Sequence, residues 1–198
     1  MIAWHFVGED RRLRDGTPLR KGRTYRLPAG TVPVMCEVGY HASVRALDAL
    51  WYAPGPIVCR VRLGGTILKD TDKLCASERT VLWWADATRT LHEFALWCAE
   101  RALKAERKAG REPDPRSWRA LRVKRAWLDG KASDQELHAA SDAARSTASD
   151  KAWSAASGAA RRAAREAAWD RARAAQNRKL SRMLLARNRA EALERNRS

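Results

Sequence analysis

The segment from Ser133 to Glu194 constrains the fold most, because good helix formers, chiefly alanine and arginine, fill nearly all of it. A single helix of about 60 residues would be roughly 90 Å long at a rise of about 1.5 Å per residue. The pair Ser157-Gly158 interrupts the alanine-rich run, and glycine weakens a helix interior. We therefore predict two packed helices, over about 134–156 and 159–194, rather than one rod.

Local start and stop signals predict the neighbouring helix ends. Asp114 followed by Pro115 is a typical N-cap and first-turn pair, and Gly130 stands where a C′ residue is expected. A helix is therefore predicted over about 115–129. The segment Ser133–Glu136 has the sequence of a capping box, which predicts the start of the next helix.

The hydrophobic period changes near Ala85. Beyond it, apolar side chains recur every three to four positions as far as Ala102, and Gly110 follows them, which predicts a helix over about 86–109. Before Ala85, short runs rich in β-branched and aromatic residues are separated by turn residues, as in strands. We expect strands over 2–7, 24–27, 32–38, 57–63, 66–68 and 80–82.

One helix is expected within this β-rich part. It should cover about 44–52, with Ser43 as its N-cap and Pro54 beyond its end. The pair Gly64-Gly65 is expected to turn the chain between two strands. The predicted fold class is α+β, with a small mixed module over residues 1–84 followed by an all-α, Ala/Arg-rich basic helical domain over residues 85–198.

Positive charge is concentrated in the second half of the chain. The formal net charge is +16 at pH 7. Residues 1–100 carry 14 Lys/Arg against 11 Asp/Glu, whereas residues 101–198 carry 25 against 12. A charge imbalance of this size creates a field that attracts polyanions. Nucleic acid is the usual partner of such a field, and an acidic protein surface is attracted by it in the same way.

The C-terminal arginines are the candidate binding residues. A helix that carries arginine on most of its outward positions can neutralise several phosphates at once, and each neutralised phosphate releases a counterion. No helix-turn-helix, zinc finger or RNA-binding motif is present, so specific base readout is not expected. The residues expected to contact nucleic acid or a partner are Arg161, Arg162, Arg165, Arg171, Arg173, Arg178, Lys179 and Arg182.

An alanine stripe from Ala140 to Ala167 lets helices approach one another closely. This stripe leaves open a homodimer through the Ala-rich helices. Trp153 and Trp169 are sixteen residues apart. We expect both to belong to the core, because large aromatic rings supply the apolar area that alanine lacks.

The composition is that of a globular protein of the cytosol. Hydrophobic residues make up 45% and charged residues 31%, which excludes a disordered chain. No apolar run approaches the ~20 residues of a membrane span, and the first residues lack the basic and apolar regions of a secretion signal. We expect a cytoplasmic protein with no membrane partner. Its four widely spaced cysteines are expected to be buried free thiols rather than disulfides or zinc ligands.

Catalytic signals are sparse. The chain has no dinucleotide-binding glycine motif, Walker loop, nucleophile elbow or His-Glu-x-x-His pair. Cys36 and Ser43 near His41 suggest a nucleophile and a base, but no motif defines their geometry. His92 and His138 lie far apart, so no metal site is expected. The sequence therefore favours a binding protein without a cofactor over an enzyme.

Two blocks carry a resemblance to known proteins. Residues 34–43, Val-Met-Cys-Glu-Val-Gly-Tyr-His-Ala-Ser, and residues 72–80, Asp-Lys-Leu-Cys-Ala-Ser-Glu-Arg-Thr, resemble an uncharacterised family common in phages and prophages. The likeness covers about residues 1–85. The Ala/Trp/Arg tail ending at 174–178 is similar to tails attached to such proteins and to predicted bacterial immunity proteins. The resemblance implies a phage-encoded accessory protein in the host bacterial cytosol, with no settled activity.

A second resemblance concerns the β-rich part. The aromatic-His strand, the turn at 39–43 leading into a helix, and the following Arg-rich strand resemble small ADP-ribosyltransferase-like folds, including an anti-CRISPR enzyme. This resemblance implies that His5, Tyr40 and Glu78 grip NAD and stabilise an oxocarbenium ion. The simpler interpretation is that His5 and Tyr40 are half-buried strand residues.

Three hypotheses follow. The first is a phage-encoded counter-defence protein, anti-CRISPR-like, that docks through its basic helical surface on nucleic acid or on a nucleoprotein defence complex and blocks it. The second is an ADP-ribosyltransferase-like enzyme that uses NAD to modify a host target. The third is a phage accessory protein that binds nucleic acid without sequence preference.

Overall fold

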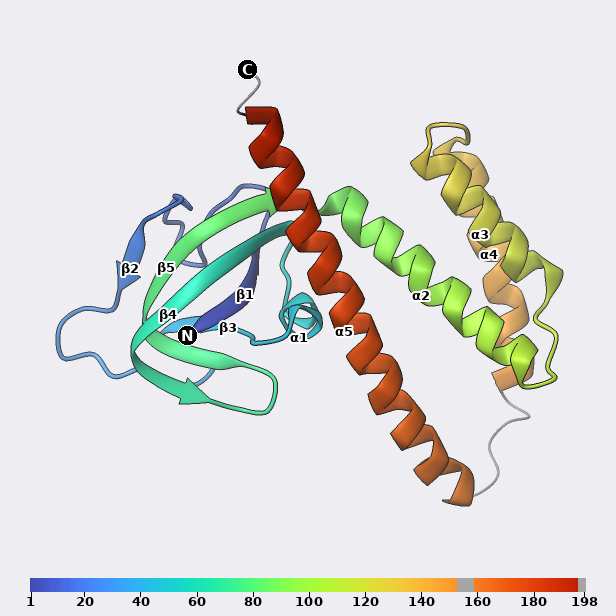
Figure 1. Ribbon diagram of the computed structural model, residues 1–198, viewed down its shortest axis with the longest axis horizontal. Coiled ribbons are helices and arrows are strands. Elements are labelled where there is room, and N and C mark those ends of the chain that lie inside the picture. Colours follow the sequence, from blue (N-terminus) through green and yellow to red (C-terminus); the bar gives the residue numbers. More distant parts are fainter. Residues whose placement is uncertain (153–158, 196–198) are drawn as a thin grey trace. The chain divides into compact units, whose positions relative to one another are not determined.

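The computed structural model describes the backbone of residues 1–152 and 159–195, and the side chains of residues 1–144 and 172–194. Figure 1 shows a strongly curved antiparallel sheet and a set of helices. This mixture confirms the predicted α+β class. The elements are, in chain order, β1 (Ile2–Val7), β2 (Thr24–Arg26), β3 (Tyr40–Ala42), α1 (Ala46–Trp51), β4 (Ile57–Lys69), β5 (Leu74–Asp86), α2 (Thr88–Lys108), α3 (Pro115–Leu128), α4 (Asp134–Ala152) and α5 (Ala159–Arg195).

The chain forms two compact units. One consists of Met1–Leu91 together with Ala175–Ser198, and the other of His92–Ala174. Helices α2 and α5 therefore each contribute to both units. The last part of α5 belongs to the unit that holds the sheet, whereas the sequence predicted a single helical domain over 85–198.

The β4–β5 hairpin is the centre of the sheet. The strand order is β1-β4-β5-β2, and all pairs are antiparallel. β2 lies opposite residues 78–80 of β5, and β3 lies opposite residues 74–76 of the same strand. On the other side of the sheet, Trp4 and Ser43 exchange two backbone hydrogen bonds of 2.8 Å. Because Ser43 directly follows β3, this bridge joins β3 to β1 and closes the sheet into a small barrel-like form.

Several local predictions in this unit are wrong because the residues concerned take part in closing the sheet. The segment 32–38 is not a strand: Val34 and Val38 form an isolated bridge around a tight turn. Ser43 does not cap α1, since its backbone is bound to Trp4. Helix α1 instead begins after Arg45, whose side chain makes no capping hydrogen bond.

The central hairpin is longer than its sequence indicates. The pair Gly64-Gly65 does not turn the chain; β4 continues through it to Lys69 with a shift in register. At this irregularity Gly65 has a φ of 63°, and the next N–H, that of Thr66, donates to the Ser77 hydroxyl at 2.9 Å. The segments 57–63 and 66–68 thus belong to one strand, and 80–82 is part of β5.

The interior of the curved sheet is the main core. Directly opposed residues of antiparallel strands share a face, so the register assigns each side chain. Trp4, Phe6 and Val58, all buried, lie on the opposite, outer face. The buried interior residues are Ala3, Val7, Leu13, Leu19, Tyr25, Ala42, Ile57, Cys59, Val61, Leu63, Leu74, Ala76 and Val81.

The local helix signals are confirmed in the second unit. Asp114 caps α3 by accepting the N–H of Arg116 at 2.8 Å. Gly130 has a φ of 71°, and the following Lys131 N–H bonds back to the Ala126 carbonyl, as in a Schellman cap. Ser133 exchanges hydrogen bonds with Glu136, which is the predicted capping box. The predicted break at Ser157-Gly158 lies outside the described residues, between the end of α4 and the start of α5.

The described cysteines are free thiols in unequal environments. Cys59 and Cys75 are buried as predicted, Cys98 is half-buried and Cys36 is exposed. Across the described ranges, no group of three or more His, Cys, Asp or Glu side chains is arranged to hold a metal ion. Over the same residues, no helix combines the length and the apolar character that a membrane crossing needs.

Candidate functional site

One side of the C-terminal part of α5 anchors the helix. Leu180 and Leu184 are completely buried. One turn before them, the Asn177 side-chain oxygen accepts a hydrogen bond from the Leu47 N–H of α1 at 3.2 Å. Because positions 177, 180 and 184 share one helix face, this face is fixed against the rest of its unit.

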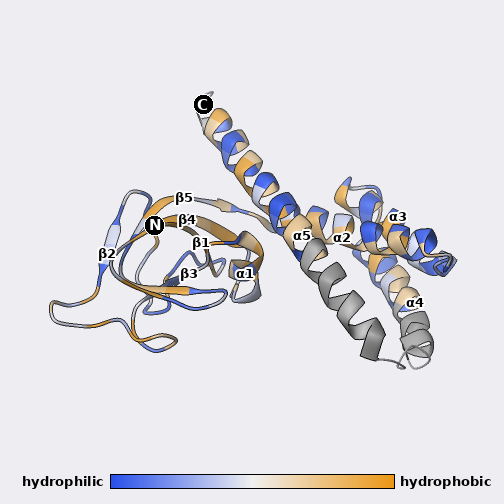
Figure 2. Ribbon diagram, turned by 60° about the horizontal axis from the view of Figure 1, so that its bottom comes forward, coloured by the Kyte–Doolittle hydropathy of each residue, from blue (hydrophilic) through white to orange (hydrophobic). Residues whose placement is uncertain are grey.

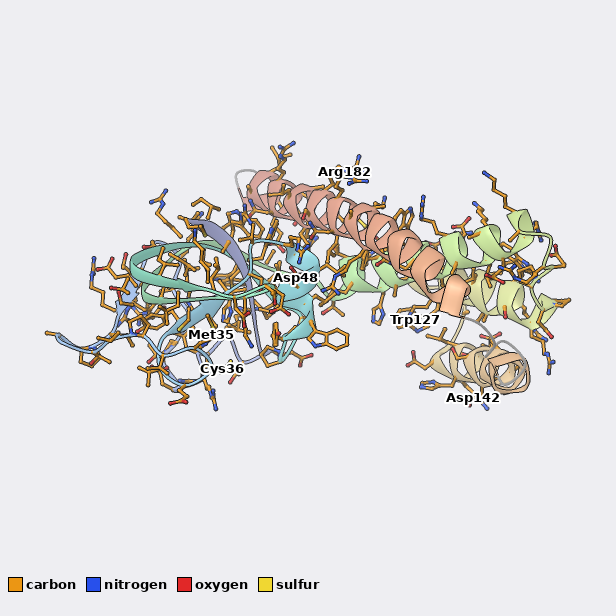
Figure 3. All side chains as sticks on the ribbon, turned by 90° about the horizontal axis from the view of Figure 1, so that it is seen from below. Met35, Cys36, Asp48, Trp127, Asp142 and Arg182 are labelled. Carbon is orange, nitrogen blue, oxygen red and sulfur yellow. The ribbon has the colours of Figure 1, made fainter. Side chains whose placement is uncertain are left out.

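The opposite side of α5 carries exposed arginines. Arg178, Arg182 and Arg189, which we call the arginine row, are all exposed. Four and then seven residues separate them, so they lie along one line on the helix surface. Figure 2 shows hydrophilic residues along this stretch, and Figure 3 shows Arg182 projecting outward from the helix. Among the described residues no carboxylate pairs with the row; Arg182 Nε bonds only the Arg178 carbonyl, at 3.3 Å.

Two leucines are interleaved with the arginine row. Leu185 is 38% exposed and Leu193 is 62% exposed, and both fall on the same line of the helix. Exposed leucine beside arginine is a composition found where one protein surface meets another. The face therefore combines positive charge with apolar area.

The other predicted binding residues have different positions. Arg173 is half-buried on the side of α5 that carries Leu180 and Leu184, and Lys179 is half-buried between the two sides. Arg161, Arg162, Arg165 and Arg171 lie in α5, but their side chains are outside the described set, as are Trp169 and the alanines from Ala148 onward; Trp153 lies outside the described residues altogether. Arg189 was missed as a site residue, although its spacing of eleven residues from Arg178 is close to three helical turns.

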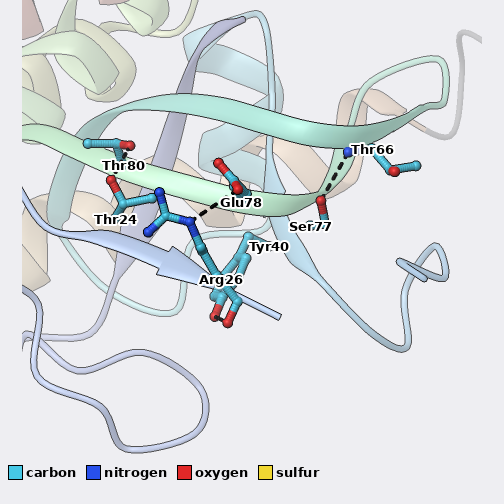
Figure 4. A network of polar contacts seen from close by, with 7 residues as sticks. All are labelled: Thr24, Arg26, Tyr40, Thr66, Ser77, Glu78 and Thr80. Carbon is cyan, nitrogen blue, oxygen red and sulfur yellow. Dashed lines mark hydrogen bonds and ion pairs between the residues drawn. The ribbon is translucent and has the colours of Figure 1, made fainter. Parts of the chain in front are cut away.

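The transferase-like residues are only partly brought together. His5 pairs in register with Cys59, and Tyr40 with Ala76, so both face the interior of the sheet. Glu78 directly precedes the interior-facing Arg79 in β5, so its side chain lies on the outer face of the sheet. Figure 4 shows its carboxylate paired with Arg26 Nε at 3.1 Å.

A buried arginine lies beside Tyr40, and its charge also acts on His5. Arg79 is 3% exposed, and one of its terminal nitrogens donates to the His41 carbonyl at 3.0 Å. Its guanidinium carbon lies 5.1 Å from the centre of the Tyr40 ring. Burial, and then the charge of Arg79, lower the pKa of His5 well below its usual value. His5 is therefore neutral at pH 7.

Cys36 and His41 are in contact, but not as a nucleophile and its base. The Cys36 backbone N–H donates to His41 Nε2 at 3.0 Å, and Cys36 has a φ of 68°. Because this imidazole nitrogen already accepts a hydrogen bond, it is not directed at the thiol. Burial also lowers the pKa of His41. The imidazole thus stabilises the turn that contains Cys36. The backbone of Ser43 is bound to Trp4.

No protein-family model matches this chain, and neither a curated protein nor a solved structure shows significant similarity to it. The functional argument therefore rests on the geometry described above.

Proposed function

We propose that this chain is a binding protein that docks through the arginine row of α5 on nucleic acid or on a nucleoprotein complex, and that it acts as a phage counter-defence factor of the anti-CRISPR kind. The supporting observation concerns the ion pairs of Arg178, Arg182 and Arg189. These exposed side chains have no carboxylate partner among the described residues, on a helix held by fully buried leucines. A rigid helix with uncompensated guanidinium groups is suited to bind phosphates.

The exposed leucines favour a nucleoprotein over bare nucleic acid. Contacts with phosphates do not require apolar side chains nearby, whereas binding to a protein surface buries apolar side chains. Leu185 and Leu193 therefore support a partner that presents both acidic groups or phosphates and apolar area. The phage origin of the protein comes from the resemblance of residues 34–43 and 72–80 alone.

Binding to a duplex oligonucleotide tests the role of the arginine row. We expect the triple change R178Q/R182Q/R189Q to weaken binding and to reduce the slope of log K against log salt by about 2 to 3, since each lost phosphate contact removes about 0.9. The matched control is R119Q/R122Q/K131Q, which removes equal charge from exposed positions of the second unit. Equal losses in both triples would show that only net charge matters.

An affinity pull-down from a CRISPR-bearing host, with and without nuclease, tests the partner class. We expect a defence ribonucleoprotein that remains bound after nuclease treatment and is lost with R178E/R182E/R189E. Recovery of nucleic acid and its coating proteins alone, all released by nuclease, would favour the third hypothesis. The transferase hypothesis stays a separate prediction: it requires an NAD-dependent mass increase on a host protein that H5A and E78A abolish.

A further inference from the structure

Arg79 is a buried cation without an anionic partner. It is opposed in register by Leu63 and Tyr25, both members of the interior core. One nitrogen donates to a backbone carbonyl and the guanidinium face stacks on Tyr40, but Nε has no hydrogen-bond partner among the described residues. Buried charges in proteins are normally paired and hydrogen-bonded. The described side chains in the interior of the sheet thus supply neither an anion for Arg79 nor an acceptor for its Nε.

Asp15 is a carboxylate whose charge acts on Arg79, but it is exposed and accepts the Thr17 N–H at 2.9 Å rather than an N–H of Arg79. The other neighbouring titratable groups supply no unpaired negative charge. Burial raises the pKa of the Cys59 thiol to about 12, and it also raises the pKa of the Tyr40 phenol. Both groups are therefore uncharged at pH 7, as is His5. The adjacent carboxylate, Glu78, is paired with Arg26.

His5 and Tyr40 are the less buried residues of the interior. His5 and Tyr40 both face the interior, yet each keeps partial exposure, whereas most of their neighbours in the core are fully buried. The interior is therefore least closed at His5 and Tyr40, and the Tyr40 ring contacts the guanidinium of Arg79.

We propose that the interior of the curved sheet binds one oxyanion group of a small molecule, a carboxylate or a phosphate, against the guanidinium of Arg79 with the imidazole of His5 as a second donor. A guanidinium presents its N–H groups in a planar fork that fits two oxygens of such a group. A bound anion also offsets the charge of Arg79, which favours a protonated His5. This site is separate from the arginine row and does not depend on the proposed docking function.

An NMR titration of the full chain tests this site. Inorganic phosphate and sodium acetate are added separately to the labelled protein at constant ionic strength, with sodium chloride as the balancing salt. We expect the His5 ring signals to shift saturably and the pKa of His5 to rise, while the exposed His138 is unaffected. Saturation by phosphate alone identifies a phosphate ligand, and saturation by acetate alone a carboxylate ligand. If neither anion shifts His5 more than chloride does, the proposal is overturned.

Two variants locate the anion. R79Q should reduce the affinity for the effective anion at least tenfold. R60Q is the matched control, because Arg60 also has an unpartnered nitrogen but is only partly buried and stacks on Trp4 on the outer face of the sheet. R60Q should bind within twofold of wild type. R79K keeps the positive charge but lacks the planar pair of guanidinium N–H groups. It should therefore bind the anion more weakly than the wild type does. If R79Q does not fold, the wild-type titration and R79K decide; unchanged affinity in R79K would contradict the bidentate arrangement.

Discussion

Asn177 of α5 accepts a hydrogen bond from the backbone N–H of Leu47 in α1, at 3.2 Å, although 130 residues separate the two positions in the chain. A backbone N–H in the first turn of a helix has no partner within that helix, so it needs one from elsewhere. Here the partner is a side chain of the helix that carries the arginine row. The contact therefore ties the proposed docking helix to the sheet unit.

The Asn177 contact should be measurable in the stability of the protein. Asn177→Ala removes the acceptor and leaves the partly buried Leu47 N–H without it, so the free energy of unfolding should fall by about 1–2 kcal/mol. Gln135→Ala, at an exposed position of α4, is the control and should change it by less than about 0.5 kcal/mol. Urea denaturation monitored by circular dichroism measures both. Equal effects of the two changes would contradict a specific role for Asn177.

The two sides of α5 should differ in their tolerance of truncation. Leu184 is completely buried, so Leu184→Ala leaves a cavity and should cost about 2–5 kcal/mol of unfolding free energy. Leu185 is 38% exposed, and Leu185→Ala should cost well under half as much. If Leu185→Ala proved the more destabilising, the orientation of the arginine row would be wrong. Leu185→Ala should instead weaken binding to a nucleoprotein partner.

The cysteines should differ sharply in reactivity. The thiolate is the reactive form, and a thiol with a pKa near 12 holds about a thousandth as much of it at neutral pH as an ordinary exposed thiol. Iodoacetamide should therefore label exposed Cys36 at least about a thousandfold faster than buried Cys59. Peptide mass spectrometry of the native protein gives the rates, and labelling in urea, where both react, is the control. Comparable native rates would contradict the closed sheet around Cys59.

Stability should fall on acidification through the histidines of the sheet unit. Burial is the largest cause that lowers the pKa of both His5 and His41, so these rings take up protons less readily in the folded chain than in the unfolded chain. Below pH ~6.5 the unfolded state therefore binds more protons, and the free energy of unfolding decreases as the pH falls toward the folded-state values. Urea midpoints at pH 7.5 and 5.5 measure this difference.

A variant assigns part of this pH dependence to one ring. His5→Gln should make the stability of the protein vary less between the two pH values. The matched substitution is His138→Gln, which removes an exposed ring of α4, and its effect on the difference should be smaller than that of His5→Gln. A pH dependence that is the same in wild type and His5→Gln would show that the His5 ring is not desolvated as described.

Signals confined to a few neighbouring residues predicted local structure well. Asp114 with Pro115, the Ser133–Glu136 box and Gly130 each act within one helical turn, so the sequence around them is enough to place a helix end. The arginine content of α5 likewise indicated a charged helix. The side of the helix on which each arginine lies was not predicted, because it depends on where Leu180 and Leu184 find their partners.

The sequence by itself determined the class of the fold, both ends of α3, the start of α4 and the excess of positive charge, because these follow from short-range propensities and from composition. Only the tertiary structure decided the roles of Ser43, Gly64-Gly65 and Arg79. Ser43 is drawn from its expected cap into the bridge with Trp4, and the two glycines become an irregularity within a long strand instead of a turn. Arg79 turns inward through the register of β5 against β2 and β4. Each outcome depends on pairing between strands far apart in the chain, and local preference does not encode that pairing.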